Sequence, residues 1–282
     1  MNISKSFRLI LVALTASVLV LATGCGGGGG SGDGDDGFPT PRLPADAATF
    51  DDLNANAIAT TAVGFLGTLD TLAQLKTASS PSLPQVARMV TDRIMRRTRN
   101  SSLIAARTED ISAGLCNPGT AIAEFDESGN SESGSVTFTG CDIEGSGIVI
   151  NGRFSYVASI NNNLDYSFHV GGLLTVAAGG ESITIEMDLL ETGNDGTGDF
   201  SSSVSFSLSG IPDSGFLVTT TQDWVGNVSI GITGGQLIIH GDNNTRLRIT
   251  VTSTNTAVVD LDDGSGTFVP VPDPDGTIMF TP

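Results

Sequence analysis

The chain has 282 residues, a hydrophobic fraction of 39% and a formal net charge of -18. The length suffices for a hydrophobic core without structural metals or dense disulfides, and the hydrophobic fraction excludes wholesale disorder. The acidity argues against general nucleic-acid binding, because neutralising phosphates needs clustered Lys and Arg. Because only 16% of the residues are charged, polarity must come from Ser, Thr, Asn and Gly, a composition that favours an exported, mainly β protein.

The N-terminus has the pattern of a signal peptide. Lys5 and Arg8 precede an apolar run over residues 9–22, and a positive region followed by a short apolar region is typical of an export signal. The run is short for a helix that spans a bilayer. We therefore expect residues 1–24 to be removed during export.

The apolar run ends in Ala22-Thr23-Gly24-Cys25. This motif resembles the lipobox of bacterial lipoproteins, although Ala22 stands where Leu is commonest. The resemblance implies that Cys25 is lipidated and becomes the new N-terminus, and Gly26, in place of Asp, implies sorting to the outer membrane. The alternative is an ordinary secretory signal followed by a chance cysteine.

Two regions of different composition follow Cys25. Residues 25–46 are rich in Gly, Asp and Pro, which predicts a flexible tether without a core. Residues 47–108 have helical periodicity, and one stripe comprises Ile58, Ala62, Phe65, Leu66, Leu69, Leu72 and Ala73. Ser79, Ser80, Pro81 and Pro84 separate this first helix from a second one at about residues 84–99.

The second predicted helix carries a cluster of arginines. Its members are Arg88, Arg93, Arg96, Arg97 and Arg99. A basic amphipathic helix can lie on anionic lipid, can dock on the acidic part of its own chain, or can simply be a solvated face. The sequence leaves these three interpretations open.

Residues 109–282 change to the two-residue period of β-strands, with 23 acidic and three basic side chains. Phe154, Tyr156, Ala158 and Ile160 alternate with polar residues, and Asn161–Asn163 predicts a hairpin turn. Since no helical stretch separates the strands, we expect an antiparallel meander of about ten to twelve strands. The predicted fold class is mainly β, a curved sheet, barrel or sandwich preceded by two N-terminal α-helices.

Three cysteines are present. With Cys25 assigned to the anchor, Cys116 and Cys141 remain as an even pair in an exported chain, which predicts a structural disulfide.

No catalytic motif is recognisable. His169 lies near Asp165 and Ser167, and Glu186 and Asp188 share one strand face, but these spacings are also ordinary for a polar strand. Asp-rich turns offer weak Ca²⁺ candidates at Asp195, Asp199, Asp260 and Asp262. We therefore predict no catalytic residue, no cofactor and no metal ion.

These observations favour a lipid-anchored envelope lipoprotein with a binding or structural role, not an enzyme, held at the outer membrane. One alternative is a carrier of a lipid or another apolar ligand on the apolar face of the sheet, with an architecture similar to periplasmic lipid carriers. A second is an envelope hydrolase using Glu186 and Asp188 or His169. The expected partners are the membrane and an envelope protein or apolar ligand, and not nucleic acid.

Overall fold

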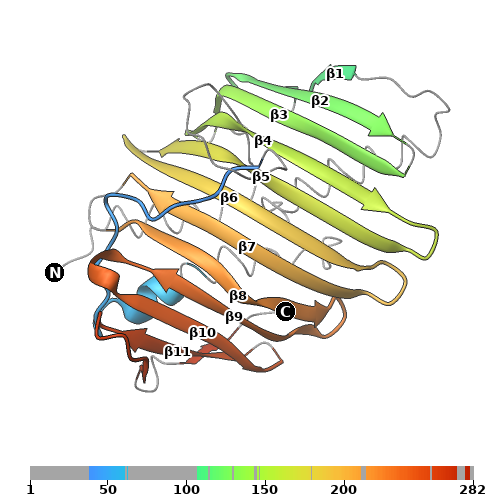
Figure 1. Cartoon of the computed structure of the whole chain (residues 1–282). Coiled ribbons are helices and arrows are strands. Elements are labelled where there is room, and N and C mark those ends of the chain that lie inside the picture. Colours follow the sequence, from blue (N-terminus) through green and yellow to red (C-terminus); the bar gives the residue numbers. More distant parts are fainter. Residues whose placement is uncertain are drawn as a thin grey trace.

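The computed structural model describes residues 38–60, 62, 107–113, 115–128, 130–142, 145, 147–178, 180–210, 214–254, 256–271 and 277–279. Its strands form one 13-stranded antiparallel sheet, in which β1 to β12 follow one another in chain order and β13 pairs with β11 (Figure 1). The strands are β1 (Arg107–Asp110), β2 (Thr120–Ser128), β3 (Ser131–Asp142), β4 (Ile148–Ile160), β5 (Asp165–Ala178), β6 (Glu181–Asn194), β7 (Asp199–Ser209), β8 (Phe216–Asn227), β9 (Gly231–His240), β10 (Arg246–Ser253), β11 (Thr256–Asp262), β12 (Val269–Pro270) and β13 (Thr277–Met279). The predicted meander is confirmed.

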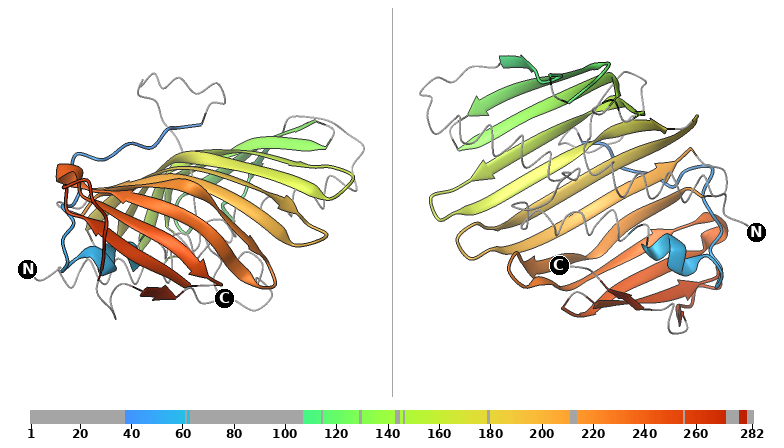
Figure 2. Two further views of the ribbon diagram at one scale, coloured as in Figure 1. Left: turned by 60° about the horizontal axis from the view of Figure 1, so that its bottom comes forward. Right: turned by 180° about the vertical axis from the view of Figure 1, so that it is seen from behind.

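The sheet is open and curved. Within the described residues no strand pairing joins β1 at one end to β12 or β13 at the other. Figure 2 shows the sheet arching over the short N-terminal helix. Of the three shapes that the alternation allowed, the structure is therefore the curved single sheet.

Alternation decides which side chains enter the core. On β4, Phe154, Tyr156 and Ala158 are buried, while the alternating residues Arg153, Ser155 and Val157 point to the other face. The same holds for Ile183 and Ile185 on β6. We call the side that buries these residues the apolar face and the opposite side the polar face. Burying a large aliphatic or aromatic side chain contributes about 1.5–3 kcal/mol, so the apolar face holds the fold together.

One short helix, covering residues 55–60 and 62, packs on the apolar face (Figure 2). Ala55, Ala59 and Ala62 have no exposed surface and repeat at i, i+4 and i+7, so a stripe of small side chains meets the sheet. Asp51 stabilises the turn that leads into the helix, because its Oδ1 accepts the N–H groups of Leu53 (3.0 Å) and Asn54 (2.9 Å).

The predicted number of helices needs correction. Residues 47–54, the start of the segment described as helical, form an isolated bridge, extended chain and a turn, and the helix begins at residue 55. In the described part of the chain a single short α-helix precedes the sheet, where two were predicted. The rest of the first predicted helix and all of the second, with Arg88, Arg93, Arg96, Arg97 and Arg99, lie outside the described residues.

The disulfide prediction is confirmed. Cys116 and Cys141 are bonded and tie the loop before β2 to the end of β3. Beside them the backbones of Asn117 and Asp142 approach closely, with an N···O distance of 2.6 Å. A Cβ added to Gly119 would lie 2.1 Å from the carbonyl oxygen of Gly140. Only glycine fits at this position, where φ is also positive.

Candidate functional site on the polar face

Residues 38–50, which we call the strap, run across the polar face before the chain turns to the apolar face (Figure 1). The strap begins over the middle of β5, where the Phe38 ring lies on His169 with centroids 3.8 Å apart. A Cβ on Gly171 would come within 2.9 Å of Phe38 Cδ1 and 3.1 Å of Pro39 Cδ. The glycine therefore makes room for the start of the strap.

His169 pairs with a carboxylate from the neighbouring strand. Its Nε2 lies 2.6 Å from Asp188 Oδ1 on β6, with Phe38 against the ring. Asp165, the partner suggested by sequence proximity, lies at the hairpin end and accepts hydrogen bonds from Asn161 (3.0 Å) and Asn194 (2.7 Å). His169 and Asp188 thus act as a polar support for Phe38.

Glu186 and Asp188 share the polar face, as the alternation predicted. Burial raises the pKa of Glu186, while a hydrogen bond from the Arg42 backbone N–H and the Arg42 charge oppose that rise. One carboxylate therefore holds the strap backbone and the other holds His169. Both groups considered for hydrolysis make contacts that position the N-terminal segment.

The second half of the strap is fixed by the ends of later strands. Asp46 Oδ2 accepts the N–H of Gly210 at 2.6 Å, and Asp46 and Ala48 exchange backbone hydrogen bonds with Gly215 at 3.0 and 2.8 Å. The N–H of Phe50 then donates to Thr245 Oγ1 at 3.0 Å. Phe50 is buried in the core, so the segment contacts both faces of the sheet.

The expected tether is therefore shorter than the composition suggested. Residues 38–46 were placed in a flexible tether that ended at residue 46, yet they lie on the sheet and Pro41 is buried. The signals that could have indicated this were Phe38, the first aromatic residue after the Gly-rich stretch, and the closely spaced prolines, which favour extended chain. Cys25 and the Gly-rich stretch lie outside the described residues.

The far end of the polar face carries two arginine–aspartate pairs. Arg246 Nε donates to Asp262 Oδ2 at 3.0 Å, and Arg248 Nε donates to Asp260 Oδ2 at 2.9 Å. The Phe268 ring lies under both guanidinium groups, 5.1 and 4.5 Å from their carbon atoms. Two of the four Ca²⁺ candidates, Asp260 and Asp262, thus have arginine as partner.

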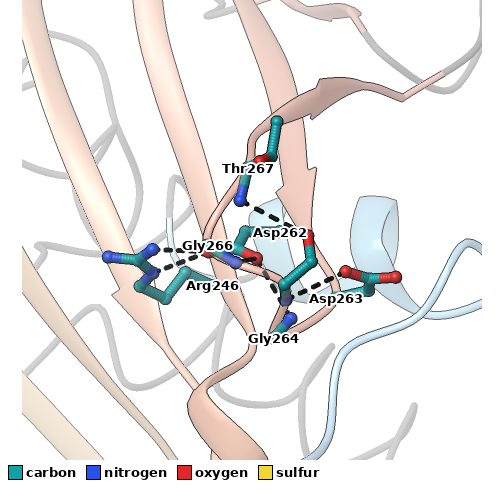
Figure 3. A network of polar contacts seen from close by, with 7 residues as sticks. Arg246, Asp262, Asp263, Gly264, Gly266 and Thr267 are labelled. Carbon is teal, nitrogen blue, oxygen red and sulfur yellow. Dashed lines mark hydrogen bonds and ion pairs between the residues drawn. The ribbon is translucent and has the colours of Figure 1, made fainter.

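A turn after β11 completes the surroundings of Asp262. Its Oδ1 accepts the N–H groups of Gly264 (3.1 Å) and Gly266 (2.8 Å), as Figure 3 shows. Burial opposes ionisation of Asp262, but the hydrogen bonds from Arg246, Gly266 and Gly264 and the Arg246 charge outweigh it and lower the pKa. The carboxylate is therefore a charged structural element.

The other two Ca²⁺ candidates lie in a hairpin turn. Asp199 accepts hydrogen bonds from Asn227 and Thr197, both at 2.8 Å, and these bonds lower its pKa. Asp195 is exposed, and its backbone N–H donates to Leu164. Across the described part of the chain, no group of three or more His, Cys, Asp or Glu residues is arranged to hold a metal ion.

Comparisons with known proteins give no match to this chain. No family model, no curated protein and no solved structure matches the chain. In the residues that the structure describes, no helix has the length and apolar character needed to cross a membrane.

Proposed function

We propose that this protein is a lipid-anchored lipoprotein of the bacterial cell envelope, held through Cys25, whose open sheet serves as a binding or structural module. The strap is the observation that supports this proposal most directly. The tether that follows Cys25 leads straight into a segment that contacts both faces of the sheet. A force applied at the anchor would therefore act on the folded sheet and not on a loose terminus.

The anchor is tested by replacing Cys25 with Ser in the full-length precursor. We expect the native protein to fractionate with membranes and to carry the mass of its acyl chains, because several buried chains hold a protein firmly to a bilayer. The Cys25→Ser protein should appear in the soluble fraction. A Cys116→Ser/Cys141→Ser variant is the matched control, since it loses two cysteines but keeps Cys25. Unchanged fractionation of Cys25→Ser would contradict the proposal.

Transport of an apolar ligand is a second candidate, and the shape of the sheet favours it. The sheet is open and curved and has one continuous apolar face. The helix contacts this face through small alanine side chains. The side chains of that face are almost fully buried, so a lipid chain would have to displace what covers them. Native mass spectrometry of the soluble Cys25→Ser protein tests the idea, and a mass equal to that of the polypeptide alone would count against it.

We do not propose hydrolysis as the function of this protein. His169, Glu186 and Asp188 each contact the strap or a residue that supports it. A positioning role accounts for all three.

A further inference from the structure

We propose that the polar face around Phe38 lies against the head-group layer of the membrane that holds the anchor, and that a small apolar patch there makes the contact. This inference rests on the proposed lipidation of Cys25. Three large apolar side chains are exposed on this face beside the start of the strap: Val157 by 41%, Leu190 by 41% and Leu173 by 50%. We call these three residues, with Phe38, the exit patch.

Strand register brings the exit patch together. Val157 on β4 lies opposite His169 on β5, and His169 lies opposite Leu190 on β6. Directly paired side chains on one face of a sheet lie about 4.5–5.5 Å apart, and Phe38 stacks on the central His169. Leu173 follows on the same face of β5, beyond Gly171. The chain therefore enters the fold beside a group of exposed apolar side chains.

The length of the tether favours the polar face as the side next to the membrane. Residues 25–37 reach about 45 Å when fully extended, but a flexible Gly-rich chain of that length spans only about 20 Å on average. Phe38 lies over His169 and Gly171, four and six residues from the nearer end of β5. That path measures about 14–20 Å, so turning the apolar side to the membrane would consume most of the average tether before it passed the sheet.

The chemistry of the face fits a hydrated lipid surface. One row across the sheet carries Ser155 on β4, Asp188 on β6, Ser205 on β7 and Thr219 on β8. Hydroxyl groups can hydrogen-bond head groups and water, while a few apolar side chains enter the boundary with the acyl chains. A surface of this kind rests on a membrane without inserting deeply.

Two single-cysteine probes test the orientation. The lipidated protein, with its native cysteines acylated or disulfide-bonded, is labelled with a fluorophore at Thr192→Cys on the polar face or at Leu53→Cys beside the helix, and reconstituted into phosphatidylcholine vesicles that contain head-group spin-labelled lipid. Since the apolar face and its helix add a layer about 10 Å thick, we expect quenching at Thr192 at least about threefold stronger than at Leu53. Equal, reversed or absent quenching at both sites would overturn the proposal.

A second pair of variants tests the exit patch. Leu190→Asp in the Thr192→Cys background should abolish most of the quenching while the protein stays on the vesicles. Ile230→Asp, at a similarly exposed apolar site in the β8–β9 hairpin, should leave it unchanged. If Leu190→Asp has no effect, the patch does not make the contact. The mass of the purified protein reports lipidation separately, so a failure of the anchor is distinguished from a failure of the orientation.

Discussion

The carboxylate of Asp262 has no exposed surface and is held by the guanidinium group of Arg246, which lies directly opposite it on β10. Arg246→Ala would leave that charge with only the N–H groups of Gly264 and Gly266. Breaking a buried pair costs about 3–5 kcal/mol and an exposed one about 0–1 kcal/mol, and Arg246 is partly exposed. We expect a loss of about 2 kcal/mol in the free energy of unfolding, measured with urea.

Arg153→Ala is the control for that experiment. The Arg153–Glu124 pair has a separation of 3.5 Å, with Arg153 partly exposed and Glu124 exposed. Its removal should change the free energy of unfolding by less than about 1 kcal/mol. Similar losses in both variants would show that burial of Asp262 is not the decisive difference.

The alanine stripe of the helix predicts that larger side chains do not fit between the helix and the sheet. Ala59 is fully buried against the sheet, whereas Ala57 on the same helix is exposed. Enlarging a side chain in a filled core costs about 1–3 kcal/mol, so Ala59→Leu should lower the midpoint of thermal unfolding and Ala57→Leu should leave it nearly unchanged. A tolerated Ala59→Leu would mean that the helix can move away from the sheet at little cost.

Docking of the strap depends on Gly171. A methyl group there would press on Phe38 and Pro39, so Gly171→Ala should detach the start of the strap. Cleavage by trypsin after Arg42, followed by mass spectrometry of the released N-terminal peptide, should then be faster. Phe38→Ala should give the same acceleration by removing the stacked ring. Equal cleavage rates in all three proteins would contradict the role of Gly171.

Stability should depend on pH through His240. Burial lowers the pKa of His240 below 6.5, and the Arg246 charge adds to this. The unfolded chain therefore binds the proton more readily, so this contribution to stability is present above pH 6.5 and is lost as the pH falls toward the folded-state pKa. The denaturation midpoint should decrease between pH 7.5 and 5.5, and less steeply in His240→Gln. Parallel pH profiles would rule His240 out as the source.

The disulfide should stabilise the end of the sheet near β3. It closes a separation of 25 residues, which in chain-entropy terms corresponds to about 3.5 kcal/mol. Cys116→Ser/Cys141→Ser should lower the thermal midpoint under oxidising conditions. Adding reductant should lower the native protein to the same midpoint and leave the variant where it is. If reductant leaves the thermal midpoint of the native protein unchanged, this assignment of the stabilising effect to the disulfide is wrong.

The fold could be predicted wherever the local periodicity of apolar residues determines which side chains are buried. Phe154 and Tyr156 are buried and Arg153 is not because side chains alternate along a strand. The disulfide followed from the count of cysteines in a chain that was predicted to be exported. The open edge could not be derived, because alternation is identical in a barrel, a sandwich and a curved sheet.

The site was less predictable because its contacts join distant parts of the chain. Nothing in the sequence near His169 points to Asp188 on another strand or to Phe38. Asp260 and Asp262 resemble turn ligands for Ca²⁺ until the register of β10 and β11 places Arg248 and Arg246 opposite them. Pairing register, and not composition, decides what each carboxylate does.

The hydrogen bond between Phe50 and Thr245 joins residues 195 positions apart. The strap is synthesised before β7–β10, yet its partners are Gly210, Gly215, Asp242 and Thr245. Contacts of such long sequence separation form late, because the intervening chain must first be ordered. The strap is therefore the first of the described segments to be synthesised and among the last to reach its place in the fold. If Cys25 carries the proposed anchor, the sheet forms before the segment that joins it to the anchor is fixed.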